Sequence, residues 1–305
     1  RNFIDAHGRT RLTMYITMTT IPINIVLNYI FMYGACGVPS LGGPGAGLGA
    51  ALSYCIFLVL NSIVVLRMKQ FARYHVFARL PKPIPREWWA LLAICVPIGL
   101  TVFCEQSIFG AVGLLMAAYG TTVLAAHQAA MNFTTIVYML PLSVSMAITI
   151  LVGYEVGAGR ENGARAYIRL SRVLTLLFVG VIALLLAVMR DSVAALYTTN
   201  PEVRELLRVF LLYALAMQFS DCVNAPLQGA LRGYKDVTVT FWLAVLSFWG
   251  IGLPSGYVLA GWTELGPYGY WAGLIGGIIV GAILLMLRLH VIENRMRRSK
   301  RTSTR

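Results

Sequence analysis

Two acidic side chains in long apolar segments are the residues of this chain best suited to chemistry. Glu105 is the only formally charged residue in the 67 positions 88–154, and Asp221 is the only one in the 23 positions 209–231. A carboxylate at bilayer depth costs about 2.5 to 3.5 kcal/mol even on the mildest insertion scale, so it usually faces a cavity or a partner. Two such groups suit a site where a proton competes with a metal cation. The alternative is a pair of neutral acids that hydrogen-bond between helices.

Polar residues at helical spacing accompany both acids. Gln218, Asp221, Asn224 and Gln228 are spaced three, three and four residues apart, so they share one helical face. A similar stripe in the span 121–152 is formed by His127, Gln128, Asn132 and Thr135. A polar stripe in an apolar helix indicates a cavity wall or a buried helix contact. The candidate cavity-lining residues are Gln128, Asn132, Gln218, Asn224 and His127.

The composition is that of a membrane protein. Hydrophobic residues make up 58% of the 305 residues, charged residues only 12%, and soluble domains carry about 25% charged residues. We therefore expect an all-α membrane protein, because apolar segments of about 20 residues span a bilayer as helices. The eight expected spans are 13–33, 45–66, 89–118, 121–152, 173–189, 206–228, 237–260 and 268–287.

The distribution of the basic residues that give the net charge of +13 indicates membrane topology rather than binding to nucleic acid. With eight spans, 22 of the 25 Lys and Arg residues fall on one side of the membrane. Basic loops of membrane proteins lie on the cytoplasmic side, so both ends of this chain are expected in the cytoplasm. The membrane is expected to be the inner or plasma membrane of the cell. The basic tail from Arg295 to Arg301 would then meet anionic lipid headgroups. We expect a monomer in the bilayer.

No motif for enzymatic chemistry is found in the sequence. It has no G-x-x-x-x-G-K-[ST], H-E-x-x-H or G-x-S-x-G segment. Its five cysteines form no C-x-x-C pair, so they are best interpreted as small buried hydrophobic residues. We expect neither a catalytic activity nor a cofactor.

A glycine pattern is repeated near both ends of the chain. Leu41-Gly-x-x-Gly-x-x-x-Gly49 recurs as Leu265-Gly-x-x-Gly-x-x-x-Gly273, and both copies have the same orientation. This indicates a parallel repeat, a plan common among transporters. The second copy has four spans before its hairpin and the first has none, so about four helices are expected before Arg1 in a twelve-helix protein.

The expected organisation has four parts. Residues 1–67 hold the last two helices of an N-terminal lobe, 68–88 form a basic cytoplasmic linker, 89–290 form a six-helix C-terminal lobe, and 291–305 form a basic tail. Three prolines in the linker favour an extended connection.

Several motifs resemble those of the multidrug and toxic compound extrusion (MATE) family, most closely its NorM-like branch. They cover most of the chain and occur in the family's order. They are Pro22-Ile-Asn-Ile-Val-Leu-Asn28, Gly42-Gly-Pro-Gly-Ala-Gly47, Ala125-Ala-His-Gln128, Val152-Gly-Tyr-Glu-Val-Gly-Ala-Gly159, Gln228-Gly-Ala-Leu-Arg-Gly-Tyr-Lys-Asp236 and Leu265-Gly-Pro-Tyr-Gly-Tyr-Trp271.

The resemblance implies two six-helix lobes around a substrate cavity and an antiport in which Na⁺ or H⁺ enters while cationic or amphipathic drugs leave. It implies a cation site at Glu105 and Asp221, which would hold Na⁺ if sodium is the coupling ion, and a cavity position at Gln128. Two alternatives are a lipid-linked precursor flippase of the same superfamily and, in a different class, an intramembrane aspartyl hydrolase. The first would line its cavity with cationic residues and the second needs a G-x-G-D setting, and neither is present around these acids.

Overall fold

A computed structural model describes residues 2–34, 40–68 and 84–303 of the chain, with side chains up to residue 296. Every regular element in these ranges is a helix, and eight helices are long and apolar enough to cross a membrane, which confirms the all-α membrane architecture and the eight expected spans. The elements are α1 (Asn2–Ala6), α2 (Thr10–Tyr33), α3 (Gly43–Arg67), α5 (Pro85–Ala117), α6 (Thr121–Gly157), α7 (Glu161–Tyr197), α8 (Pro201–Gly233), α9 (Val237–Val245), the π-helical turn η2 (Leu246–Gly252), α10 (Leu253–Trp262) and α11 (Pro267–Ser303).

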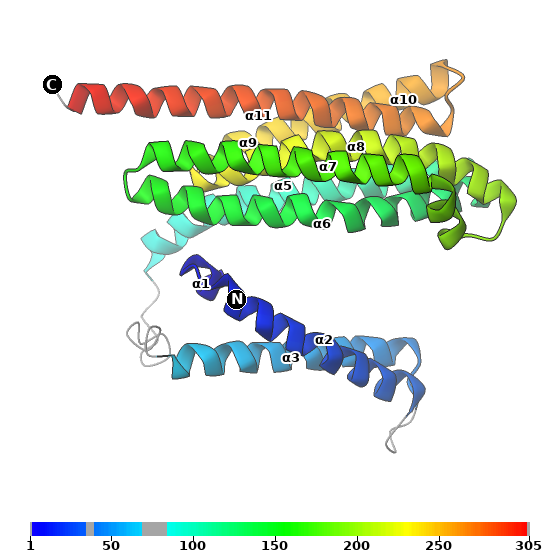
Figure 1. The fold of residues 1–305 in the computed structure, drawn as a ribbon, viewed down its shortest axis with the longest axis horizontal. Coiled ribbons are helices and arrows are strands. Elements are labelled where there is room, and N and C mark those ends of the chain that lie inside the picture. The colour runs from blue at the N-terminus through cyan, green and yellow to red at the C-terminus, as the bar shows by residue number, and fades with distance from the viewer. Residues whose placement is uncertain (1, 35–39, 69–83, 304–305) are drawn as a thin grey trace. The chain divides into compact units, whose positions relative to one another are not determined.

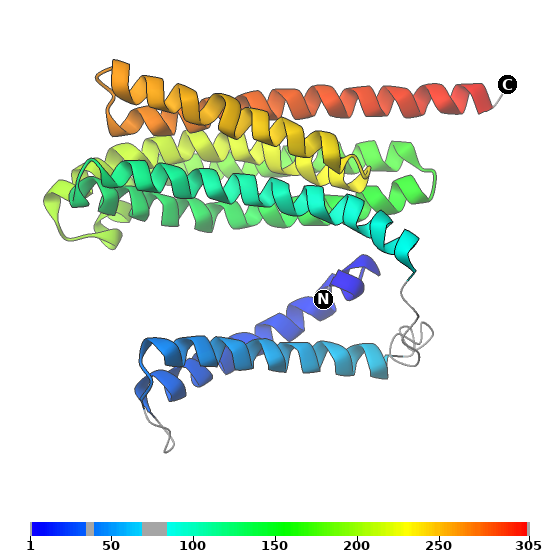
Figure 2. The same ribbon diagram turned by 180° about the vertical axis from the view of Figure 1, so that it is seen from behind.

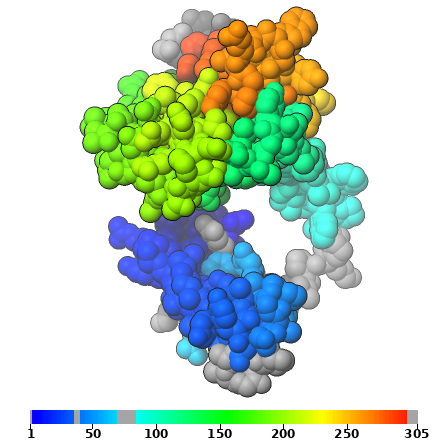
Figure 3. All heavy atoms as spheres, turned by 90° about the vertical axis from the view of Figure 1, so that its right-hand side faces the viewer, coloured from blue at the N-terminus to red at the C-terminus, as the bar shows by residue number. Residues whose placement is uncertain are grey.

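The described helices form two compact units, residues 1–84 and 85–305. The second unit holds six of the eight membrane-spanning segments. Consecutive spans run antiparallel, because short turns join them (Figures 1 and 2). The turns α5–α6, α7–α8 and α10–α11 lie together at one end of this unit, which Figure 3 shows in space-filling form. The turns α6–α7 and α8–α9 lie at the opposite end with the C-terminus, so three basic segments of the sequence gather there (Figure 1).

Helix α8 is the centre of the second unit. It contacts α6, α7, α9 and α11, and from Asn224 to Leu231 each of its residues is buried. Helix α5 lies at the edge, against α6, α9 and η2. Many large hydrophobic side chains are exposed on the outer faces of the helices, as expected for surfaces that face lipid.

The repeated glycines have the same structural roles in both copies. Gly42 and Gly266 precede α3 and α11 with φ values of 58° and 51°, which few residues other than glycine adopt. Three residues later, a Cβ at Gly45 would overlap the backbone of Phe31, and one at Gly269 would overlap that of Ala260. Both hairpins therefore pack backbone against backbone, as small residues permit in membranes.

The seventh expected span is present but is not one uninterrupted α-helix. Residues 246–252 make a π-helical turn, with α9 before it and α10 after it. Pro254 has no N–H to donate to the carbonyl of Gly250, so the regular α-helical ladder is interrupted here. Gly252 also lies close to the backbone of Gly273 and Gly277 in α11. The wider turn accommodates both features, and π turns are frequent at functional sites.

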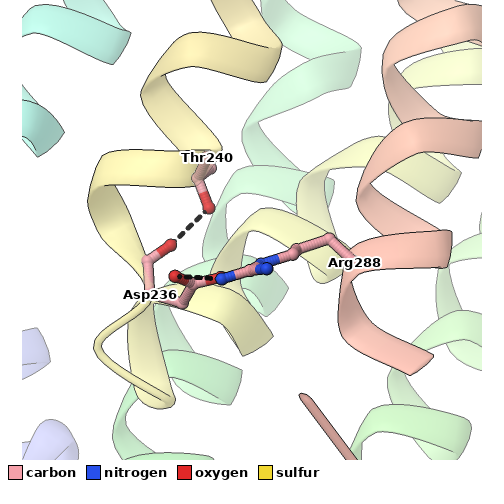
Figure 4. Close-up of polar contacts among 3 residues, drawn as sticks. All are labelled: Asp236, Thr240 and Arg288. Carbon is pink, nitrogen blue, oxygen red and sulfur yellow. Dashed lines mark hydrogen bonds and ion pairs between the residues drawn. The ribbon is translucent and has the colours of Figure 1, made fainter. Parts of the chain in front are cut away.

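The turn between α8 and α9 is fastened to α11 by a bidentate ion pair. Arg288 donates from Nε to Asp236 Oδ2 at 2.6 Å and from a terminal nitrogen to Oδ1 at 3.1 Å (Figure 4). The hydroxyl of Thr240 donates to the Asp236 carbonyl at 2.7 Å. A planar guanidinium paired with both carboxylate oxygens fixes orientation as well as distance. This end of α8 is therefore held in place by the neighbouring helix.

Two boundaries differ from those expected at the linker and the tail. Residues 85–88 form the first turn of α5 rather than linker, because Pro85 supplies a favoured first helical residue. Helix α11 continues through Ser303, so 291–303 extend the last helix. Residues 69–83 of the predicted linker, and the side chains of the tail after residue 296, lie outside the described part of the chain.

The close crossing of α10 and α11 predicts a position-specific cost for one added methyl group. In Gly273→Ala the new Cβ would overlap Gly256 and lie 2.7 Å from the Gly252 carbonyl oxygen. Overpacking of this kind costs about 1–3 kcal/mol. We expect the melting temperature of the purified protein to fall by several degrees. Gly276→Ala is the control, because its Cβ would meet open space. Equal melting temperatures for the two variants would contradict this packing.

Candidate functional site

A cavity of about 190 Å³ within the second unit contains both intramembrane acids. Glu105 comes from α5 and Asp221 from α8, and their carboxylates line the same space. None of the described lining residues is Lys or Arg. The remaining lining residues are Gln106, Phe109, Met131, Thr134, Thr135, Tyr138, Met139, Leu142, Met217, Asn224, Ala225, Gln228 and Phe248.

A proline determines the local course of α8 beside the site. Pro226 cannot donate an N–H to the carbonyl of Cys222, the residue after Asp221. The hydroxyl of Thr175 on α7 donates to this carbonyl at 2.8 Å, and Thr175 is fully buried. In a membrane such a freed carbonyl has no water to bind, so a neighbouring side chain must satisfy it. Thr175 therefore stabilises the segment of α8 that carries Asp221.

Glu105 is held by a hydrogen bond from α8. Gln228 Nε2 donates to Glu105 Oε1 at 2.6 Å and also contacts Asn224 Oδ1 at 3.2 Å. Trp249 of η2 donates from Nε1 to the carbonyl of Cys104, the residue before Glu105, at 3.3 Å. The acid is thus positioned by a side chain on α8 and by the π turn.

Asp221 is in a different situation. Within the described residues, no hydrogen bond or ion pair is made to its carboxylate, which lines the cavity. One oxygen of Glu105 and both oxygens of Asp221 therefore remain available. Carboxylate oxygens are suitable ligands for a hard monovalent cation, and they can also take up a proton. The residues present are consistent with such an occupant.

The predicted polar stripes are divided between the cavity and the packing of the helices. Asn224 and Gln228 line the cavity with Asp221, whereas Gln218 is buried and donates to the carbonyl of Thr134 at 2.5 Å. His127 is buried in the apolar core, where its Nδ1 accepts from Trp271 Nε1 at 3.1 Å.

The other two candidates on α6, Gln128 and Asn132, are exposed on the surface of the second unit and do not line this cavity. Asn132 accepts a hydrogen bond from the Tyr197 hydroxyl at 3.0 Å.

Several lining residues were not singled out from the sequence. Tyr138 and Leu142 follow Thr135 at steps of three and four residues, so they extend the α6 stripe by two more positions. Their side chains are aromatic and apolar, so the pattern of polar residues in the sequence does not indicate them. Phe248 lies on the π turn, and no sequence signal placed it at the site.

Glu155 lies away from the cavity, at the turn between α6 and α7. Arg160 donates to it at 2.9 Å and 3.2 Å, and this hydrogen bonding raises the pKa of Arg160 above its usual value. A Cβ at Gly163 would overlap the Glu155 carboxylate, so the glycine leaves room for the pair. This acid belongs to the turn rather than to the intramembrane site.

Comparison with known proteins identifies the family. The model of the MatE family matches residues 97–258, which include Glu105, Asp221 and the whole of the cavity lining. The chain belongs to the MatE family. Relatives of this chain are named as multidrug resistance proteins and as MATE transporters rather than as enzymes.

MATE relatives of known sequence match almost the entire chain. A probable multidrug resistance protein NorM of Bacillus subtilis is 47% identical over 295 residues, which are 97% of this chain and 65% of the relative. The corresponding protein of Oceanobacillus iheyensis is 48% identical over 296 residues, 97% of this chain and 66% of the relative. The chain thus spans slightly less than two thirds of the length of these proteins.

Solved structures agree with the fold. A eukaryotic MATE transporter superimposes with a TM-score of 0.88 at 18% identity and covers 98% of this chain and 66% of its own. The Vibrio cholerae MATE transporter VcmN, in a bent form, gives a TM-score of 0.80 at 20% identity, covering 96% of this chain and 65% of its own. At these identities the likeness shows the fold alone, which is the MATE fold of a multi-pass membrane protein.

The hydroxyl of Thr175 offers a test of how α8 is held. Thr175→Val removes the donor and leaves the Cys222 carbonyl without its partner, which costs about 1–3 kcal/mol for a buried group. We expect a lower melting temperature for the purified protein. Thr175→Ser keeps the hydroxyl and should melt closer to the unchanged protein than the valine variant. If the serine variant melts no higher than the valine variant, the hydrogen bond is not what stabilises α8.

Proposed function

We propose that the complete gene product carrying this chain is a cation-coupled antiporter that exports cationic and amphipathic drugs. The observation that carries the proposal is the shared cavity of Glu105 and Asp221, which holds two carboxylates and no basic side chain among the described residues. A sodium ion or protons would supply positive charge there. The NorM names of the relatives support the class of substrate.

The proposed mechanism is alternating access by two six-helix lobes. Residues 1–67 would belong to the N-terminal lobe and residues 89–290 to the C-terminal lobe, joined by the 68–88 linker. A cation at Glu105 and Asp221 could favour one arrangement only if it binds the two arrangements with different affinities. In this proposal both chain ends are cytoplasmic, in the inner or plasma membrane, and the transporter works as a monomer.

The cavity wall is suited to varied organic cations. Phe109, Tyr138 and Phe248 provide aromatic faces, and Met131 and Met139 provide flexible apolar side chains. Aromatic rings attract cations, and methionine repacks around ligands of different shapes. Among the described lining residues none is basic and could hold a pyrophosphate, so the geometry does not favour a lipid-linked precursor flippase.

The first test of this function is ion-driven efflux. The complete gene product in liposomes should release a fluorescent cationic dye under a sodium gradient, a proton gradient or both. Asp221→Asn should reduce gradient-driven efflux at least about tenfold, because one of the two charges at the site is lost. Glu264→Gln is the control, since Glu264 is exposed in the α10–α11 turn and outside the cavity. Equal efflux by Asp221→Asn and the unchanged protein would refute the coupling site.

A second test concerns the substrate. Phe109→Ala removes an aromatic face from the cavity, and a cation–π contact is worth about 0.5–2 kcal/mol. We expect the KM for an aromatic cationic dye to rise roughly two- to thirtyfold. Phe103→Ala is the matched control on α5, because Phe103 is 67% exposed and does not line the cavity. If both variants keep the original KM, the dye does not bind against Phe109.

A further inference from the structure

Gln228 lies at the centre of a chain of hydrogen bonds that leads out of the cavity. Its Nε2 donates to Glu105 Oε1 at 2.6 Å and contacts Asn224 Oδ1 at 3.2 Å. Its Oε1 accepts from a terminal nitrogen of Arg232 at 3.2 Å. Asn224 continues the chain, since its Nδ2 donates to the Ile278 carbonyl on α11 at 3.5 Å.

These partners leave the Gln228 amide only one orientation. Arg232 can only donate hydrogen bonds, and an ionised Glu105 can only accept them. The amide oxygen must therefore face Arg232 and the amide nitrogen must face Glu105. Without Arg232 the amide oxygen would have no donor to hold it away from Glu105. The amide could then rotate by half a turn and bring its oxygen against the carboxylate, where the two would repel each other.

The position of Arg232 explains why an amide is placed between it and the acid. Arg232 is one helical turn beyond Gln228, near the end of α8 at Gly233, and does not line the cavity. A guanidinium in the cavity would neutralise one carboxylate and repel an incoming cation. The neutral amide donates to Glu105 without adding positive charge to the site.

We propose that Gln228, oriented by Arg232, is a positioning residue of the cation site. Gln228 holds one oxygen of Glu105, so the other oxygen is turned toward the space that Asp221 also lines. The proposal rests on the function proposed above, because it assumes that these two acids bind the coupling ion. It goes beyond that function by assigning a role to two residues that do not carry the charge of the site.

Few other groups near Glu105 could hold or orient its carboxylate. The titratable or charged groups near it are Cys104 on α5, Tyr138 on α6, and Asp221 and Arg232 on α8. The sequences of α9 and η2, which pack against α5, contain none. Among the described residues, Gln228 is the side chain that hydrogen-bonds to the Glu105 carboxylate.

The test compares the driving ion's half-saturating concentration among variants of the complete gene product. Efflux of one cationic dye is followed in liposomes while the driving ion, sodium or proton, is varied. Gln228→Leu should raise the half-saturating sodium concentration about tenfold or more, because the Glu105 carboxylate is no longer held toward the site. If the driving ion is the proton, the half-saturating proton concentration should fall instead, because a hydrogen bond that stabilises the ionised carboxylate is lost. The maximal rate at saturating ion should change much less. An unchanged half-saturating concentration would overturn the proposal.

Arg232 supplies a second variant that leaves the cavity wall intact. Arg232→Gln should shift the half-saturating concentration in the same direction by a smaller factor, and Arg232→Lys should restore it in part. In the Gln228→Leu background, Arg232→Gln should add a smaller shift than it causes alone, because the part of its effect that passes through the amide is already lost. Independent, additive shifts would show that Arg232 does not act through Gln228.

Ion binding is also read without transport. The driving ion should raise the melting temperature of the purified protein, and in Gln228→Leu the ion concentration needed for this rise should shift about tenfold in the direction expected for efflux. Gln218→Leu is the matched control, since Gln218 is a buried glutamine of α8 that donates to a backbone carbonyl instead of a carboxylate. It should melt lower but keep the original ion dependence.

The outcomes separate this proposal from the proposed function. If Asp221→Asn loses its ion dependence and Gln228→Leu keeps that of the unchanged protein, the cation site stands and the role of Gln228 is wrong. If Asp221→Asn also keeps its ion dependence, the cation site itself is wrong.

Discussion

A negative charge held away from water has to be compensated, and the second unit of this protein is arranged around that requirement. Glu105 and Asp221 share one cavity among membrane-spanning helices. Glu105 has a donor in Gln228, whereas Asp221 has no partner among the described side chains. The protein's own hydrogen bonds therefore compensate the charge of Glu105 in part and leave that of Asp221 without compensation. A site that the protein itself neutralised fully would have little affinity for a cation.

The backbone faces a similar constraint, because every interrupted hydrogen bond in a membrane must be replaced. Pro226 frees a carbonyl in α8, and Thr175 from α7 replaces the missing donor. Trp249 adds a donor to the carbonyl of Cys104 in α5. Both contacts are made to the carbonyl of a residue beside an acid, Cys222 next to Asp221 and Cys104 next to Glu105. The irregular helices beside the cavity are therefore tied to their neighbours rather than left loose.

Much of this arrangement could be predicted from the sequence because membrane insertion penalises charge so strongly. Glu105 and Asp221 stood out as isolated charges, and the spans followed from apolar length. The use of each polar residue could not be predicted in the same way. Gln218 bonds to a carbonyl 84 positions away and His127 to a tryptophan 144 positions away. Such pairings depend on helix rotation and packing, which one sequence pattern does not determine.

The charge content of the cavity has an electrical consequence. With both acids ionised and no basic residue in its described lining, the cavity can accept two monovalent cations before its charge is balanced. An exchange of two small cations entering for one organic monocation leaving would carry a net positive charge inward. An inside-negative membrane potential then contributes about 2.3 kcal/mol for each such charge per 100 mV. Voltage would therefore be an energy source for this exchange even where the ion's own concentration gradient is small.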